Sequence, residues 1–183
     1  MNIQPLGLSG VFSVEIERRT DERGFFARSF CAREFAHKEL ETTWVQANTS
    51  FSAAKGTVRG MHFQRPPKAE VKLVRCVRGA ALDVVVDIRA GSPTHGRWIS
   101  YELTAEARNA IYVPHGFAHG FQTLEPDTEL MYFVSEFYSP DDEGGLCYND
   151  PLLAIGWPLP AASVSPRDLA HPSFAELQPV ELA

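Results

Sequence analysis

The sequence has no long apolar segment and few cysteines. No run approaches the roughly 18 consecutive apolar residues that a membrane-spanning helix needs. The N-terminal segment MNIQPLGLSGVFSV has neither a basic start nor a clear cleavage site, so we expect no secretory signal. The three cysteines, Cys31, Cys76 and Cys147, are odd in number and widely separated, which argues against a disulfide framework. We therefore expect a cytoplasmic protein with no membrane partner.

An excess of positive charge is also missing. Seventeen Lys and Arg stand against 23 Asp and Glu, which gives a net charge of −6 and a sequence pI near 5.5. This balance provides no general electrostatic case for binding nucleic acid. Apolar residues make up 44% of the chain and charged residues 22%, a composition typical of a packed domain and not of a disordered chain. The length predicts a single domain over residues 1–183, and we find no repeat or linker.

Short strands are the main element that the sequence predicts. Thirteen Gly and thirteen Pro interrupt it and disfavour long helices. In residues 11–17 apolar and polar side chains alternate, as in a half-buried strand. Further strands are predicted at residues 25–30, 44–51, 58–64, 71–77, 81–88, 98–103, 110–113, 116–123 and 129–135. This series predicts an all-β sandwich or barrel.

Helices are expected at two places only. Residues 31–40 carry Phe35, Ala36 and Leu40 near helical spacing. A helical turn is predicted at residues 166–170, where Ser165 can cap the first turn and Pro166 occupies its start. The tail from about residue 157 is rich in Pro and Ala, and we expect it to wrap the surface.

Strand alternation makes three polar side chains candidates for a shared cavity. His62 lies on the face of its strand opposite Met61 and Phe63. Lys72 and Asp83 occupy the next two predicted strands. If these strands are neighbours, His62, Lys72 and Asp83 can point into one cavity. In an open sheet Lys72 and Asp83 would instead face solvent, and the pattern fits both arrangements equally well.

Two histidines lie in the unusual segment PHGFAHGF at residues 114–121. The glycines argue against a helix, and on a strand His115 and His119 would lie roughly 13 Å apart, too far for both to ligate one ion. His62 with either of them and a carboxylate could still form a metal site. A purely structural role for His115 is the alternative.

Several separated blocks, found in a fixed order from about Phe12 to Asp168, resemble one known family. The blocks are residues 21–26 (DERGFF), 46–50 (QANTS), 55–64 (KGTVRGMHFQ), 72–74 (KLV), 83–89 (DVVVDIR), 114–121, Tyr138 with Pro140, 143–144 (EG), 149–151 (NDP) and 157–158 (WP). Together they resemble the dTDP-4-dehydrorhamnose 3,5-epimerase family, which acts on nucleotide-diphospho-4-keto-6-deoxyhexoses. The resemblance implies a cupin-type jelly-roll barrel with a few short helices. It also implies a homodimer that exchanges N-terminal strands, and catalysis without a metal or other cofactor.

The resemblance assigns catalytic roles to four residues. The C4 ketone of such a substrate acidifies the hydrogens on C3 and C5, so that a base can form an enolate. His62 matches the base, and Asp168 matches the carboxylate that orients it. Lys72 would stabilise the negative charge on the C4 oxygen, and Tyr132 matches the proton donor. Without the resemblance, the pattern favours Tyr132 as an ordinary aromatic residue of a strand.

The resemblance also implies a set of substrate-binding residues. Arg23 and Arg59 suit the diphosphate, because guanidinium groups form paired, charge-assisted hydrogen bonds. Tyr138 and Phe26 would stack on the base. The remaining polar contacts are Gln46, Asn48, Asp83, His119, Glu143 and Arg167.

Arg28 departs from the family pattern, which has a Glu that contacts thymine. Thymine offers an N3–H donor to a carboxylate, whereas cytosine offers acceptors that a guanidinium could serve. One hypothesis is therefore a CDP-linked sugar. The other is that Arg28 turns outward or pairs with a nearby acid, and the thymine site is intact. Smaller departures are Tyr148, where the family often has Trp, and the loop at residues 65–70.

Other functions remain open at this stage. A relative could epimerise only C3 or only C5. A metal-dependent cupin isomerase or dioxygenase is a more distant alternative, although His62-Phe63-Gln64 lacks the His-x-His pair typical of such enzymes. A non-catalytic sugar-binding jelly roll is the third, against which the matches at all four catalytic positions argue.

Overall fold

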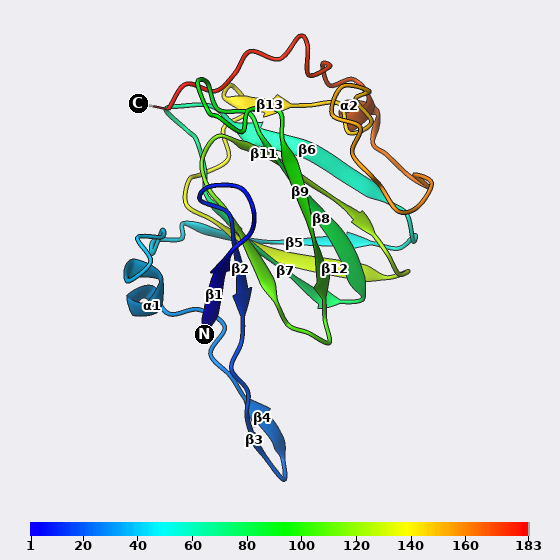
Figure 1. Ribbon diagram of the computed structural model, residues 1–183. Helices are drawn as coiled ribbons and strands as arrows, with labels where there is room; N and C mark the ends of the chain where they lie inside the picture. Colours follow the sequence, from blue (N-terminus) through cyan, green and yellow to red (C-terminus); the bar gives the residue numbers. More distant parts are fainter. Residues whose placement is uncertain (183) are drawn as a thin grey trace.

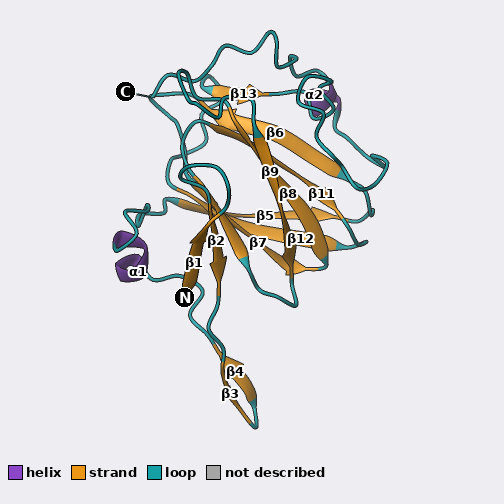
Figure 2. Cartoon of the chain, viewed as in Figure 1, coloured by secondary structure: helices purple, strands orange, loops and turns teal. Residues whose placement is uncertain are grey.

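Two antiparallel sheets face each other in the computed structural model, which describes residues 1–182 (Figure 1). The six-stranded sheet has the order β1 (Asn2–Pro5), β2 (Phe12–Glu15), β10 (Ala110–Val113), β7 (Lys72–Arg78), β12 (Thr128–Val134) and β5 (Gln46–Ser52). The five-stranded sheet has the order β13 (Glu143–Gly145), β6 (Val58–Gln64), β11 (Phe117–Thr123), β8 (Ala80–Asp87) and β9 (Trp98–Thr104). The all-β prediction is confirmed, and the two sheets form a jelly-roll barrel (Figure 2).

The main core lies between the two sheets. Strand alternation turns Val74, Ile111 and Leu130 of the six-stranded sheet inward, where they meet Leu103 and Phe121 of the other sheet. These five side chains are at most 6% exposed. Their burial stabilises the barrel and leaves the polar side chains of the same strands to line its open end.

The C-terminal tail packs on the outer face of the five-stranded sheet. Trp157, Phe174 and Leu177 contact the second buried cluster, which includes Met61 and Ile88. A parallel bridge between Thr57 and Ser163 holds the tail beside β6. Helix α2 (Pro166–Leu169) follows, and as predicted the Ser165 hydroxyl caps it by accepting a hydrogen bond from the Asp168 N–H at 3.0 Å. The tail therefore brings Asp168 to the surface of β6.

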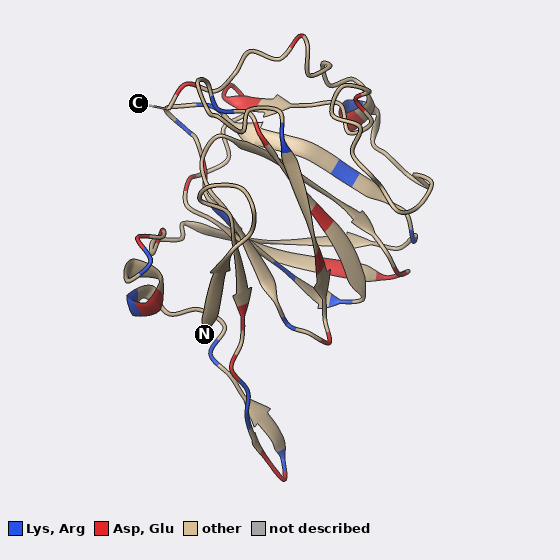
Figure 3. Cartoon of the chain, in the orientation of Figure 1, with Lys and Arg blue, Asp and Glu red and all other residues tan. Residues whose placement is uncertain are grey.

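A hairpin of β3 (Arg19–Asp21) and β4 (Gly24–Phe26) projects from the sheets (Figure 1). Basic and acidic segments both occur along it (Figure 3). In β4 the guanidinium groups of Arg18 and Arg108 each lie 5.0 Å from the centre of the Phe25 ring. These contacts fix the direction in which the hairpin leaves the barrel.

The first helix and the strand before it are shorter than the sequence predicts. The strand expected at residues 25–30 ends at Phe26, and the helix expected at residues 31–40 covers only α1 (Ala32–Ala36). Cys31 makes no side-chain cap, and Glu39 adopts a positive φ of 58° that ends the helical path. Strands β1, β3 and β13 were not predicted, because Pro5, the charged residues Arg19 and Asp21 and two glycines give them compositions that are not strand-like. No helix within residues 1–182 is long and apolar enough to cross a membrane.

Candidate active site

A cavity of about 440 Å³ opens between the sheets beside α2, and a second of about 230 Å³ continues it. His62, Lys72 and Tyr132 line both. His62 comes from β6 in one sheet, whereas Lys72 and Tyr132 come from the adjacent strands β7 and β12 in the other. The three side chains therefore approach a common space from opposite walls.

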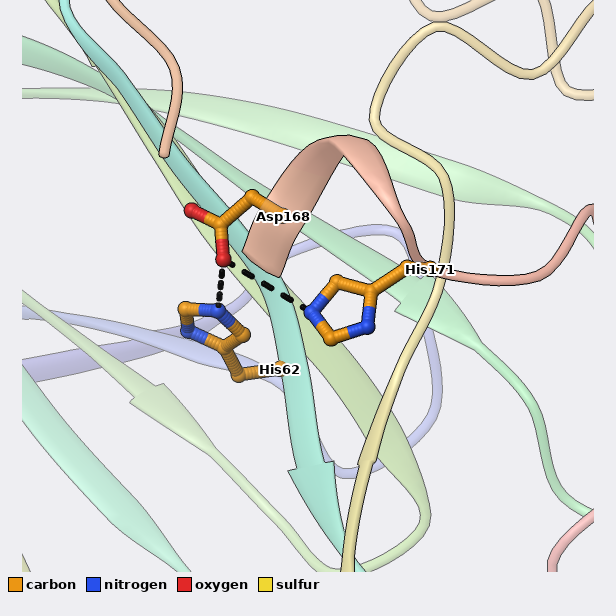
Figure 4. A group of neighbouring side chains, drawn as sticks. All are labelled: His62, Asp168 and His171. Atoms are coloured by element: carbon orange, nitrogen blue, oxygen red, sulfur yellow. Dashed lines mark hydrogen bonds and ion pairs between the residues drawn. The ribbon is translucent and has the colours of Figure 1, made fainter. Parts of the chain in front are cut away.

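His62 and Asp168 form a hydrogen-bonded pair at one wall (Figure 4). The imidazole Nε2 lies 2.8 Å from Asp168 Oδ1, and the Gly60 N–H donates to Oδ2 at 3.2 Å. Burial lowers the pKa of His62 below its ordinary value, although the Asp168 carboxylate acts against this. Burial acts to raise the pKa of Asp168, but hydrogen bonds from His62 and Gly60 hold it below its usual range. His62 is therefore neutral and Asp168 ionised near pH 7.

Lys72 lies opposite the pair and has a carboxylate partner. Its Nζ is 3.0 Å from Glu70 Oε1, and the two side chains are only 11% and 12% exposed. The neighbouring Tyr132 is half-buried and lies in register with Asn48 of β5. This wall presents an ammonium group and a phenol to the cavity.

A second histidine–carboxylate pair lies deeper in the barrel. His119 Nε2 is 2.8 Å from Asp83 Oδ2, and Asp83 is completely buried. Burial raises the pKa of Asp83 above its usual range, against the opposing effects of His119 and Lys72. The alternative in which Lys72 and Asp83 face solvent is wrong, because the opposing sheet covers them. His115 lies outside both sets of cavity-lining residues and is half-buried in the loop before β11.

Polar side chains at the cavity mouth form a connected group. Tyr138 donates its hydroxyl to Glu143 at 2.7 Å, and Arg167 pairs with the same carboxylate. Burial acts to raise the pKa of Glu143, but these hydrogen bonds keep it below its usual range. Gln46 accepts from the Tyr138 N–H at 3.1 Å, which ties β5 to the group.

Arg59 lines the larger cavity, as Arg167 does. Its guanidinium donates to Ser52 Oγ at 3.1 Å and to the Phe51 carbonyl at 2.9 Å. The side chain is exposed and lines the cavity. These two bonds fix a positive charge at the rim.

Four predicted binding residues lie outside this space, and the first of them is the completely buried Asp83. Arg23 and Phe26 belong to the projecting hairpin, where Arg23 pairs with Asp21 at 2.6 Å and Phe26 is 69% exposed. Arg28 donates to Glu34 at 2.9 Å. A nearby acid therefore satisfies Arg28, as one of the two hypotheses for this residue states.

Two residues in the site were missed from the sequence. Glu70 precedes Lys72 by two positions, a spacing that places both on one face of an extended segment. His171 follows Asp168 by three positions, and its Nε2 lies 3.6 Å from Asp168 Oδ1. The i,i+3 spacing after a capped helical start was the available signal for His171.

A family model for dTDP-4-dehydrorhamnose 3,5-epimerase matches residues 5–176. The chain belongs to this family. The resemblance read from the sequence blocks is thereby confirmed.

Individual members of the dTDP-4-dehydrorhamnose 3,5-epimerase family are similar to the chain over nearly its whole length. The 3,5-epimerase of Sinorhizobium fredii is 44% identical over 178 residues, which cover 97% of this chain and 91% of the relative. The dTDP-4-dehydrorhamnose 3-epimerase of Streptomyces niveus is 42% identical, covering 92% and 81%. The crystal structure of the Legionella pneumophila enzyme in complex with dTDP-4-keto-L-rhamnose has a TM-score of 0.89 at 38% identity, covering 100% and 99%.

Proposed function

We propose that this chain inverts C3 and C5 of dTDP-4-dehydro-6-deoxyglucose by proton abstraction and reprotonation. The observation that carries this proposal is the arrangement of His62, Lys72 and Tyr132 around one cavity, with Asp168 behind His62. No metal or organic cofactor is assigned a role. The three unpaired cysteines support a cytoplasmic location.

His62 acts as the base through Nδ1. The bond to Asp168 requires the proton of the neutral ring to lie on Nε2, which leaves the Nδ1 lone pair to accept a proton from carbon. When the ring becomes charged, the ionised Asp168 stabilises it. The lowered pKa of His62 supports this role, because the neutral form predominates near pH 7.

Lys72 and Tyr132 act from the opposite wall. Removal of the carbon-bound proton places negative charge on the C4 oxygen, and the Lys72 ammonium can stabilise it by a charge-assisted hydrogen bond. Tyr132 lies on the strand next to Lys72, so its hydroxyl faces the side of the sugar remote from His62. Protonation from that side inverts the carbon.

The nucleotide lies toward the rim. Arg59 and Arg167 can bind the diphosphate, and the exposed ring of Tyr138 can stack on the base. Polar contacts to the sugar and the base come from Gln46 and Asn48, which line the smaller cavity. Since Glu34 already satisfies Arg28, we assign a thymine nucleotide, as in the bound ligand of the Legionella relative.

The projecting hairpin supports a homodimer. Arg23 and Phe26 cannot serve the cavity of their own chain from the position they occupy, but a partner's cavity could receive them. Mixing a His62→Ala chain with an Arg23→Ala chain tests this directly. If the hairpin acts in the partner, each mixed dimer contains one intact site and activity returns. If it acts within its own chain, both sites carry a lesion and no activity returns.

Deuterium uptake tests the reaction. The protein is incubated with dTDP-4-keto-6-deoxyglucose in heavy water, and the label is located by NMR and mass spectrometry. We expect label at C3 and C5 with the wild type, none with His62→Ala, and unchanged label with His95→Ala, an exposed histidine outside the cavity. Label at one carbon only would replace the proposal with a 3- or 5-epimerase. Uptake only from a CDP-linked sugar would overturn the thymine assignment.

A further inference from the structure

The imidazole of His171 points at the same carboxylate oxygen as that of His62 (Figure 4). Asp168 Oδ1 lies 2.8 Å from His62 Nε2 and 3.6 Å from His171 Nε2. The three ligand-capable atoms all lie within 4.8 Å of one another. The proposed reaction uses His62 and Asp168 and leaves His171 without a role.

The Nε2 atom of His171 is buried and has no hydrogen-bond partner in the described part of the chain. At 3.6 Å the contact with Asp168 is too long to be a hydrogen bond. An unpaired buried donor or acceptor is unfavourable, and such groups usually have a partner. The atom is thus aimed into the cluster and available for a further bond.

The position of the His171 ring is fixed from behind by Gly145 of β13. A Cβ atom at residue 145 would overlap the ring itself, so the ring packs directly against the glycine backbone. The side chain is 11% exposed. The third ligand atom is therefore held near the other two before any ion arrives.

We propose that His62, Asp168 and His171 bind a divalent ion of the zinc class, and that this ion inhibits the enzyme. Two imidazole nitrogens and one carboxylate oxygen are a ligand set that zinc accepts with a fourth position open. His62 and Asp168 line the cavity, so water can fill that position.

The required movement is small. Zinc–nitrogen bonds of about 2.0–2.1 Å with tetrahedral angles place ligand atoms about 3.3 Å apart. The separation of Asp168 and His62 must open from 2.8 Å, and that of Asp168 and His171 must close from 3.6 Å. The separation of His62 and His171, at most 4.8 Å, must close as well, and all three changes lie within the reach of side-chain rotation.

Inhibition follows from the tautomer of His62. The ion needs the lone pair of Nε2, which carries the proton in the free enzyme. Upon binding, that proton leaves Nε2 and Nδ1 takes one up, so the ring stays neutral and gains no net proton. Nδ1 then has no lone pair with which to accept a proton from substrate. This half of the inference rests on the proposed function, whereas metal binding does not.

Cobalt(II) titration of the metal-free protein, without substrate, tests the site. The visible absorption of bound cobalt reports a tetrahedral environment of nitrogen and oxygen ligands, and added zinc displaces the cobalt. Because loss of an outer-shell partner alone weakens metal binding by about 10–100-fold, we expect loss of a direct ligand in His171→Gln to weaken cobalt and zinc binding by at least as much. His95→Ala should leave both unchanged. Gly145→Ala, which displaces the ring and changes no ligand, should weaken binding as well.

The second measurement is the deuterium uptake rate with added zinc. We expect zinc to inhibit the wild type and a chelator to reverse the inhibition. We expect the His171→Gln variant to be active and to need about tenfold or more zinc for the same inhibition. Equal cobalt affinity in the wild type and His171→Gln would overturn the site. Zinc binding without loss of uptake would overturn the inhibition. Cobalt binding through His171 in a protein with no epimerase activity would contradict the proposed function and leave the site standing.

Discussion

Replacing Asp168 by Asn changes one oxygen of the carboxylate that is hydrogen-bonded to His62 into an amide NH₂ group. The Gly60 N–H must still find an acceptor at 3.2 Å, and only the amide oxygen of Asn can serve. The amide NH₂ group then faces His62 Nε2, which must become an acceptor. The ring proton therefore moves to Nδ1, and the lone pair that accepts the substrate proton is lost.

The size of the effect follows from these two losses. General base catalysis is typically worth about 10²–10⁴-fold. The variant also loses the carboxylate that stabilises the charged ring, so we expect a loss of about 10³–10⁴-fold in kcat. At 1.36 kcal/mol for each factor of ten, this is about 4–5.5 kcal/mol in the activation barrier.

Deuterium uptake measures this loss, with thermal unfolding as a check on folding. Asp141→Asn makes the same change at an exposed position outside both cavities and should retain full activity. An Asp168→Asn protein that folds and keeps more than a tenth of wild-type kcat would refute the argument from the tautomer.

Three further outcomes are expected. Tyr132→Phe should lower product formation by about 10²–10⁴-fold while deuterium exchange on the His62 side continues, and a wild-type yield of inverted product would exclude Tyr132 as the acid. Because burial lowers the pKa of His62, kcat/KM should rise with pH with a midpoint below pH 6.5, and a midpoint above that value would contradict the neutral base. Asp87→Asn should lower the free energy of unfolding by about 2 kcal/mol, or the Tm by about 4–8 °C, because it breaks a buried pair with Arg89. The pKa of Asp87 is lowered to about 2, so the stabilisation by its carboxylate is present above pH 3.8 and disappears as pH falls through 2. Equal free energies of unfolding for the wild type and the variant at pH 7 would contradict this prediction.

Strand positions followed from the sequence because the alternation of side chains is a property of the extended backbone. The predictions for β6 and β10 match the observed bounds, and the others differ mostly by one or two residues. The helix predicted at residues 31–40 is present but shorter, because apolar spacing continues to Leu40 whereas the backbone adopts a positive φ at Glu39. Spacing records which side chains could share a face but not where the chain leaves the helical path.

The site was predictable only in part. Alternation placed His62, Lys72 and Asp83 on candidate cavity faces, but burial of Lys72 and Asp83 depends on the opposite sheet, which no local pattern describes. The pairing of His62 with Asp168 spans 106 positions and came from the family resemblance alone. For His171 the sequence offered only the i,i+3 spacing from Asp168, and it gave no sign that Gly145 lies behind the ring.

The docking of the tail on β6 also has a consequence for synthesis of the protein. Asp168 is made after every strand of both sheets, because β13, the last of them in the chain, ends at Gly145. The strands of the barrel are therefore all made before the carboxylate that sets the His62 tautomer. Proton abstraction by His62 becomes possible only after the tail has been made and has packed on β6.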